Sequence, residues 1–428
     1  MSLLSWQERP AATLAGGGVI GPDERLPWPQ TAAMGVQHVI AMFGATVLAP
    51  ILMGFDPNLA IFMSGIGTLI FYFITGGKVP SYLGSSFAFI GVVIAATAYA
   101  GKGPNANLGL ALGGIIACGV VYIAIGAVVQ AVGTGWIERL MPPVVTGAVV
   151  AVIGLNLAGV PIKNMAAGNF DSWMQLVTFV SVALVAVFTR GMVQRLLILV
   201  GLALATLIYL LLTNGLGLGK PMDFSGIAAA AWVGVPKFTA PVFDGNAMLL
   251  IAPVALILVA ENLGHIKAVA AMTGKNLDAS IGRAFIGDGV ATVVSGSAGG
   301  TGVTTYAENI GVMAATRIYS TAVFLVAALL ALVLGFSPKF GALIQAIPLP
   351  VMGGVSIVVF GLITIAGAKI WVDNKVDFSD PANLLTAAIT LILGTGDFTL
   401  KFGDFALGGI GTATFGAVLL HALLRRRD

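Results

Sequence analysis

The chain has 428 residues, of which 58% are hydrophobic and 9% are charged, and its formal net charge is +3. A typical soluble domain carries about 25% charged residues, so the polar side chains are too few to cover a surface that faces water. This composition excludes a set of soluble domains and an intrinsically disordered chain, and the single cysteine excludes a disulfide scaffold. The sequence predicts an all-α polytopic membrane protein. It predicts no nucleic-acid partner, because the basic residues lie between apolar segments.

Residues 1–29 are polar and rich in proline, and they lack the pattern of a signal peptide, so we expect a cytoplasmic tail. Fourteen apolar segments follow, and a helix needs about 20 residues to span the hydrocarbon. The segments are 30–53, 58–76, 80–100, 108–132, 136–159, 171–189, 194–214, 243–270, 280–297, 302–315, 317–336, 340–368, 379–396 and 405–424.

Segments three and ten differ from the others. Both open with small and polar residues, and segment ten is too short to span as a helix. We therefore expect a short strand or a half-helix break in each of them.

The basic residues predict the orientation. With fourteen spans and a cytoplasmic N-terminus, 15 of the 21 basic residues, including all ten arginines, fall on the inner side. Basic residues favour the cytoplasmic side of a membrane protein. Both termini are therefore predicted to be cytoplasmic. The six basic residues left outside are Lys102, Lys163, Lys220, Lys237, Lys339 and Lys401.

Two pairs of segments indicate an internal repeat. Residues 143–155 (PVVTGAVVAVIGL) match 350–362 (PVMGGVSIVVFGL) at an offset of 207, so that Gly154 pairs with Gly361. Residues 85–92 (SSFAFIGV) can be laid over 305–312 (TYAENIGV), which share the ending IGV, and this places Phe87 opposite Ala307. Seven spans separate the members of each pair, and an odd number inverts the second copy across the membrane. We expect two inverted seven-segment repeats, the plan of many secondary transporters, whose sites lie where broken helices meet.

Three carboxyl groups fall inside predicted spans, namely Glu261, Asp288 and Glu308. A charged group at mid-bilayer costs roughly 2.5–3.5 kcal/mol on insertion scales, so such residues usually serve function. His265 lies four residues after Glu261 and projects from the same helix face. The functional interpretation makes Glu261 a ligand for substrate and for a proton; the alternative is a structural pair with His265 or Lys267. Asp288 fits a second proton group and a structural hydrogen bonder equally well.

Glu308 stands where the helix of segment ten is predicted to begin. A helix start offers free backbone N–H groups to a polar ligand, although Glu308 could also act only as a capping acid. Ser85, Ser86 and Phe87 form the matching break in segment three, where the Phe87 ring could stack on a flat ligand or simply pack.

Other polar residues near these positions are predicted to support the site. They are Gln37 and His38 in segment one, and Tyr306 and Asn309 beside Glu308. The chain contains neither GxxxxGK[ST] nor HExxH. We therefore expect no ATP-driven pump, no enzyme, no metal site and no organic cofactor.

These motifs resemble the nucleobase–ascorbate transporter family, also called nucleobase:cation symporter-2. Glu308-Asn309-Ile310-Gly311 followed by Thr316-Arg317 matches the family signature [Q/E/P]-N-x-G-x4-T-[R/K/G] at every position. The Gln37-His38 pair and the stretch YLGSSFAF at 82–89 are also similar to that family, and within it to the bacterial uracil permeases. The likeness extends from about residue 30 to residue 424.

The resemblance implies a domain plan. A cytoplasmic tail (1–29) is followed by the first part of a core domain (30–132, segments 1–4) and of a gate domain (133–240, segments 5–7). The second parts are 241–336 (core, segments 8–11) and 337–428 (gate, segments 12–14). Family likeness also implies homodimers in the bacterial cytoplasmic (inner) membrane, in contact with its lipid.

The resemblance also assigns residues. Glu261 matches the acid that binds the base and couples the proton, and His265 matches the histidine that supports it. Glu308 matches the acid that binds a ring N–H, and Phe87 the residue whose backbone N–H meets the base. Ala307 stands where uracil permeases usually have glycine. Gly302-Val303 likewise replaces their usual Pro-Asn, so we do not expect the substrate fit to follow from the family pattern in detail.

The predicted function is proton-coupled import of uracil, with a proton as the coupling ion. Uracil offers two N–H donors and two C=O acceptors, which two carboxyls and the backbone N–H groups of residues 87 and 307 would satisfy. A xanthine, purine or broad nucleobase carrier is the alternative. An anion exchanger of the related sulfate-transporter architecture is a third, against which the acid-lined site argues.

Overall fold

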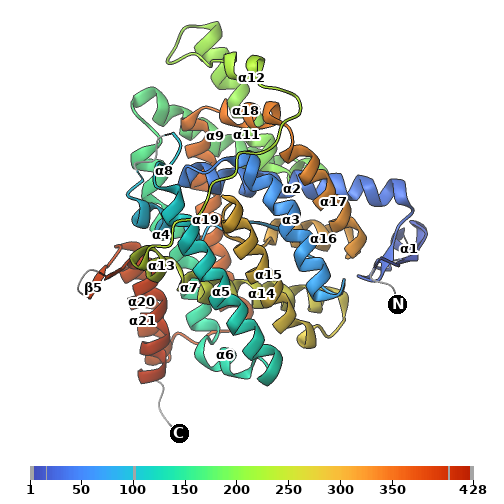
Figure 1. The fold of residues 1–428 in the computed structure, drawn as a ribbon, viewed down its shortest axis with the longest axis vertical. Coiled ribbons are helices and arrows are strands. Elements are labelled where there is room, and N and C mark those ends of the chain that lie inside the picture. Colours follow the sequence, from blue (N-terminus) through green and yellow to red (C-terminus); the bar gives the residue numbers. More distant parts are fainter. Residues whose placement is uncertain (1–3, 16, 100–102, 403–404, 425–428) are drawn as a thin grey trace.

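A computed structural model describes residues 4–15, 17–99, 103–402 and 405–424. Lys102 and Arg425 to Arg427, which entered the charge count above, lie outside the described residues. Helices dominate the fold, and α12 and α6 lie at opposite ends of the molecule (Figure 1). In chain order the elements are β1 (Gln7–Glu8), α1 (Ala12–Ala15), β2 (Glu24–Arg25), α2 (Trp28–Met53), α3 (Pro57–Thr75), β3 (Leu83–Ser85), α4 (Phe89–Thr97), α5 (Leu108–Val132), α6 (Gly135–Leu140), α7 (Pro143–Leu157), α8 (Gly159–Asn164), α9 (Asn169–Phe188), α10 (Met192–Arg195), α11 (Leu197–Leu210), the π-helix η1 (Leu211–Gly215), α12 (Ser225–Ala229), α13 (Gly245–Ile251), α14 (Val254–Thr273), α15 (Asp278–Ala298), β4 (Val303–Thr305), α16 (Ala307–Thr316), α17 (Thr321–Gly335), α18 (Pro338–Gln345), α19 (Leu349–Asp373), α20 (Pro381–Thr395), β5 (Leu400–Phe402), β6 (Phe405–Leu407) and α21 (Gly409–Leu424).

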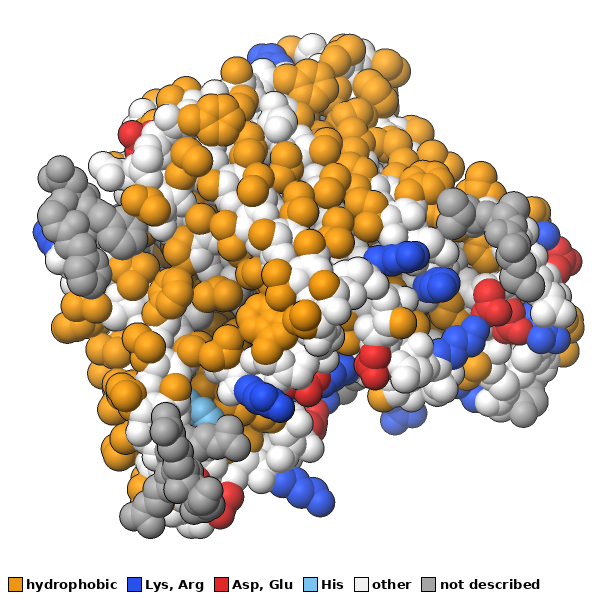
Figure 2. All heavy atoms as spheres, turned by 60° about the horizontal axis from the view of Figure 1, so that its bottom comes forward, with side chains coloured by type: hydrophobic (Ala, Val, Ile, Leu, Met, Phe, Trp, Pro, Cys, Tyr) orange, Lys and Arg blue, Asp and Glu red, His pale blue; other side chains and the backbone are white. Residues whose placement is uncertain are grey.

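The helices are those of a multi-pass membrane protein. Within the described residues, eight helical stretches are long and apolar enough to cross a membrane, and a ninth is reached if α17 and α18, bent by 84°, form one span. In Figure 2 most charged side chains lie toward the lower and right margins, and hydrophobic side chains fill the broad flank above them. Lipid tails suit such a flank better than water does.

Segments three and ten each contain the expected break. A three-residue strand precedes a short helix in both: β3 before α4, and β4 before α16. The two strands pair antiparallel, with Gly84 opposite Thr304. Two further backbone bonds extend the pairing, from the N–H of Ser86 to the Gly302 carbonyl (2.9 Å) and from that of Tyr306 to the Tyr82 carbonyl (3.1 Å). Backbone N–H and C=O groups of each interrupted segment thereby find hydrogen-bond partners in the other segment.

Two predicted segments were wrong in where they begin, and proline is the common reason. The helix expected from 136 begins at Pro143, and the one expected from 340 begins at Leu349. The segment over 243–270 is one membrane-length stretch, Gly245–Thr273, with a break near Pro253. Proline lacks the N–H that continues a helix and disfavours helical backbone in the residue before it. The short helices α6, α18 and α13 therefore stand apart from the long helices that follow them.

The two segments matched as repeats, α7 and α19, pack against each other. The indole N–H of Trp371 donates to the Val144 carbonyl at 3.0 Å. Glycines permit this closeness: a Cβ on Gly154 would lie 2.2 Å from the Phe360 carbonyl oxygen, and one on Gly367 would lie 2.5 Å from that of Gly147. Small residues at helix crossings are typical of membrane proteins.

The N-terminal tail is tied to the connection between α16 and α17. Ile20 exchanges backbone hydrogen bonds with that connection, donating to the Arg317 carbonyl (3.0 Å) and accepting from the N–H of Tyr319 (2.7 Å). The indole N–H of Trp6 donates to the Thr321 hydroxyl at 2.9 Å. The tail predicted over 1–29 thus forms part of the folded structure, and α2 begins at Trp28, inside the range assigned to it.

Candidate functional site

The paired strands place two helix starts close together. Glu308 lies in the first turn of α16, and Phe87 lies two residues before α4. Ala307 is exposed, and Glu308 and Phe87 are half-buried. The first turn of a helix carries N–H groups without partners in the helix and a partial positive charge. A polar molecule that reached this break would therefore meet both a carboxyl and backbone donors.

Helix α14 brings a second carboxyl to the break. Glu261 and His265 are both half-buried, and Nδ1 of His265 lies 2.8 Å from the Thr305 hydroxyl oxygen on β4. Helix α14, which carries Glu261, packs against α16, which carries Glu308. The structure thus brings together Glu261, His265 and Glu308, which lie up to 47 positions apart in the sequence. The described partner of His265 is Thr305, which sequence reasoning missed.

Tyr306 holds the strand pair rather than facing outward. Its side chain is buried, and its hydroxyl donates to the Ser85 carbonyl (2.9 Å) and accepts from the Thr46 hydroxyl (3.1 Å). A Cβ on Gly84 would lie 2.5 Å from the Tyr306 ring, so glycine at that position makes room for the tyrosine. Ser86 stabilises the start of α4, because its hydroxyl accepts from the N–H of Ala88 at 3.2 Å.

The signature residue Asn309 joins α16 to α2. Its amide nitrogen lies 2.9 Å from Nδ1 of His38 and donates to the His38 carbonyl at 3.1 Å. His38 is fully buried, and its ring lies 4.6 Å from that of Phe324 on α17. Gln37 is also buried, and its side-chain nitrogen has no hydrogen-bond partner among the described residues.

Replacing Asn309 with Ala is expected to lower the melting temperature of the purified protein. The change removes the partner of a fully buried histidine, and an orphaned buried polar group costs about 1–3 kcal/mol. Asn383 offers a matched control, because its amide bonds a backbone carbonyl at an exposed position. An Asn309→Ala protein that melts with the wild type and the Asn383→Ala control would contradict this support.

Asp288 lies in a buried hydrogen-bond network. Its Oδ2 accepts from the amide of Asn262 (2.7 Å) and from the Tyr122 hydroxyl (3.3 Å), and that hydroxyl also accepts from Asn262 (2.9 Å). All three side chains are buried. The network joins α5, α14 and α15, and its member Asn262 directly follows Glu261 in the chain. Sequence reasoning missed Tyr122, which stands in an apolar run without any local signal.

The Phe87 side chain contacts α19. Its ring lies 6.2 Å from that of Phe360 on α19, with the planes at 87°. An edge-on aromatic pair of this kind leaves a ring face of Phe87 outside that contact.

Among the described residues, no group of three or more His, Cys, Asp or Glu side chains could hold a metal ion.

The last signature position, Arg317, ends α16 in a left-handed conformation with φ of 59°. Glycine adopts this conformation without strain, which explains why the signature accepts glycine there. The Arg317 guanidinium donates to the Leu14 carbonyl at 3.1 Å and so also holds the N-terminal tail.

Solved structures show where this fold occurs. The transmembrane domain of a cyanobacterium bicarbonate transporter BicA matches with a TM-score of 0.64 and 17% identity, over 91% of this chain and 97% of that one. Murine Slc26a9, an anion transporter, matches with a TM-score of 0.66 and 12% identity, over 92% and 67%. At such identities the likeness concerns the fold alone.

Sequence relatives are much nearer. The Escherichia coli (strain K12) protein named "Putative pyrimidine permease RutG" is 67% identical over 99% of this chain and 95% of its own. The uracil permeases of Paenibacillus larvae and of E. coli (strain K12) are 42% and 38% identical, over 94% and 95% of this chain and 96% and 94% of theirs. A model described as "Permease family" matches residues 29–402. The chain therefore belongs to this permease family, that of the nucleobase–ascorbate transporters, and is a transporter rather than an enzyme.

Proposed function

We propose that this protein is a proton-coupled symporter that imports uracil, or a closely related pyrimidine, across the bacterial cytoplasmic membrane. The observation that carries the proposal is the packing of α14, with half-buried Glu261, against α16, whose first turn holds half-buried Glu308. The names of the relatives, pyrimidine permease and uracil permease, support the substrate class.

The chemistry of the site suits a nucleobase. Uracil presents two N–H donors and two carbonyl acceptors on a flat ring, and every one of them needs a partner once buried. Glu261 and Glu308 would accept the N–H groups, and the backbone at Phe87 and Ala307 would meet the carbonyls. A proton on Glu261 would enter with the base, and His265 would support that carboxyl. Neither step requires a metal or an organic cofactor.

The proposed topology has fourteen segments in two inverted repeats. Eight spans qualify by length and composition, and the six further segments are β3–α4, α15, β4–α16, α17, α20 and α21. The antiparallel pairing of β3 with β4 and the crossing of α7 with α19 support the repeat, because each joins corresponding parts of the two copies. With both termini cytoplasmic, the broken segments meet within the membrane, as in other transporters of this plan.

Transport would follow from movement of the core (30–132 and 241–336) against the gate (133–240 and 337–428). The loaded core carries uracil and the proton past the gate, releases both inside and returns empty. The contact between the Phe87 ring of the core and the Phe360 ring of the gate would change during this movement. We further propose that the protein acts as a homodimer held in the lipid bilayer.

An ion pair joins the proposed gate and core. Nζ of Lys267 on α14 lies 2.7 Å from Oε1 of Glu138 on α6, and both side chains are about half exposed. The hydrogen bond from Lys267 lowers the pKa of Glu138 from its ordinary 4.5. A lowered pKa means that the pair is intact at neutral pH and is lost only as the pH falls through that lowered value.

Replacing Glu138 with Gln is expected to change the uracil uptake rate by no more than about fivefold at pH 7, because an exposed pair contributes at most about 1 kcal/mol. At a second pH, below the lowered pKa of Glu138, the difference between variant and wild type should shrink. Initial rates at the two pH values check this, and Asp373→Asn, which breaks an exposed pair within α19, is the control. A variant that loses uptake entirely would show a different role for Glu138.

Labelled uracil uptake into proteoliposomes with an imposed inward proton gradient tests the function. Accumulation that a protonophore abolishes and excess xanthine leaves unchanged is the expected result. Competition by xanthine would instead support a carrier for purines and pyrimidines. Uptake of bicarbonate down an imposed bicarbonate gradient, without any transport of uracil, would instead assign the protein to the anion carriers that share the fold.

A further inference from the structure

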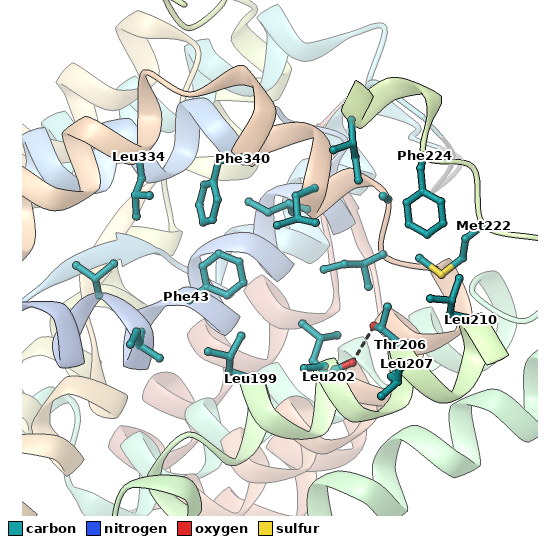
Figure 3. A pocket seen from close by; sticks show the side chains of 18 of the residues that line it. Phe43, Leu199, Leu202, Thr206, Leu207, Leu210, Met222, Phe224, Leu334 and Phe340 are labelled. Carbon is teal, nitrogen blue, oxygen red and sulfur yellow. Dashed lines mark hydrogen bonds between the residues drawn. The ribbon is translucent and has the colours of Figure 1, made fainter. Parts of the chain in front are cut away.

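A large apolar groove lies away from the proposed uracil site. Its volume is about 740 Å³, and four stretches of chain line it: α2, α11, the 222–227 stretch and the α17–α18 pair. We name it the α11 groove. Figure 3 shows Leu199, Leu202 and Leu207 of α11 along one wall, with Phe340 and Leu334 facing them and Phe43 between the walls. The size is within the range of about 300–1,000 Å³ that is usual for ligand sites.

The groove offers nothing to a polar ligand. Thr206 supplies the lining hydroxyl, and it already donates to the Leu202 carbonyl at 2.8 Å. Leu207, Val333 and Leu343 line the groove and are 53%, 67% and 54% exposed. In a multi-pass membrane protein, the medium that reaches such side chains is lipid hydrocarbon. An unfilled groove would forfeit the dispersion contacts that close packing provides.

The dimensions suit one acyl chain. The α11 wall extends from Leu199 to Leu210, eleven residue steps or about 16 Å at the rise of an α-helix. Half of a hydrocarbon core about 30 Å thick is about 15 Å. The groove is therefore as long as one leaflet is deep.

Two lysines lie close to the lining residues along the chain. Met222 and Phe224 lie beside Leu210 in Figure 3, and the carbonyl of Lys220, two residues before Met222, accepts from the Tyr209 hydroxyl at 2.9 Å. Lys339 directly precedes the lining residue Phe340.

The ammonium group of Lys339 lies over a tryptophan ring. Nζ of Lys339 lies 4.8 Å from the centre of the Trp232 ring, which is 75% exposed. Exposed tryptophan beside lysine is typical of the lipid headgroup level. Both lysines also belong to the set predicted to lie outside.

We propose that the α11 groove binds one acyl chain of an anionic phospholipid, whose phosphate is held by Lys220 and Lys339. The occupant is a lipid of the outer leaflet, because both lysines are predicted on that side. The groove is lined both by α2 and α17 of the proposed core and by α11 of the proposed gate, which also contacts α2. A bound lipid would thus fill the seam between them; this consequence rests on the proposed function, whereas lipid binding does not.

Native mass spectrometry of the purified, delipidated full chain tests the proposal, with phosphatidylglycerol and phosphatidylcholine as probes. We expect one phosphatidylglycerol per chain to bind roughly thirtyfold more tightly than phosphatidylcholine, the effect of two lysines near an anionic headgroup. Replacing Lys220 and Lys339 with Ala should remove this preference. The matched change of Lys163 and Lys401, two other predicted outer lysines, should leave it. Equal binding of the two lipids by the wild type would overturn the headgroup assignment.

A pair of leucines tests the groove itself. Leu207 lines it, whereas Leu204, on the same helix and 42% exposed, is absent from its lining. Leu207→Trp should fill the groove and abolish the lipid adduct, and Leu204→Trp should retain it. If Leu207→Trp does not fold, Ala203→Leu makes a smaller filling of the same wall. Equal adducts in both tryptophan variants would refute the site, and dimers dissociated by Leu207→Trp alone would show that a second copy covers the groove instead.

Discussion

Replacing Glu261 with Gln is expected to abolish the concentration of uracil by a proton gradient while leaving exchange of internal for external uracil. Glutamine keeps the size and one carbonyl acceptor of the side chain but cannot take up a proton. The variant would therefore resemble the loaded carrier, which crosses in both directions with its substrate. The measurement compares gradient-driven accumulation with counterflow of labelled uracil in the same proteoliposomes.

Glu8→Gln provides the matched control, because Glu8 pairs with Arg25 in the N-terminal tail and its side chain is 55% exposed. Glu8→Gln should accumulate uracil as the wild type does. Full accumulation by Glu261→Gln would place the proton on another group, and the buried Asp288 network would be examined next. Loss of both accumulation and counterflow would contradict the expected result. It would show that Glu261 is needed to bind or carry uracil itself, and not only to take up the proton.

The second large effect is expected when Gly154 is replaced with Ala. The sequence repeat pairs Gly154 with Gly361, which has free space around it. A Cβ on Gly154 of α7 would lie 2.2 Å from the Phe360 carbonyl oxygen and 2.4 Å from the Thr364 hydroxyl oxygen. Backbone cannot yield as a side chain end can, and overpacking of this kind typically costs about 1–3 kcal/mol or more. Gly154→Ala should therefore lower the melting temperature and the yield of folded protein.

Gly361, its counterpart in the second repeat, should behave in the opposite way. It is exposed on α19, and nothing lies within 4 Å of a Cβ built there. Alanine is favoured over glycine in a helix interior by up to about 1 kcal/mol. Gly361→Ala should melt at or above the wild-type temperature. Thermal unfolding in detergent measures both variants, and equal destabilisation of the two would contradict the α7–α19 crossing.

The sequence by itself determined the solvent of this protein and much of the plan of its broken segments. Composition alone required a bilayer, since 9% charged residues cannot cover a water-facing surface. The short polar openings of segments three and ten predicted their breaks, because lipid tolerates irregular backbone only where protein satisfies it. The signature at Glu308 and Asn309 led to the family.

The tertiary structure decided which residues meet. Proline positions moved two helix starts and broke a third segment, which hydropathy cannot detect because proline interrupts a helix without reducing the apolarity of the segment. Thr305 as the partner of His265, and Tyr122 as a partner of Asp288, come from elements 40 and 166 positions away. Gly154 and Gly361 occupy equivalent places in the sequence repeat, yet only the first meets a neighbouring backbone. Contacts between distant segments depend on how helices cross, and a single sequence carries no local signal of that crossing.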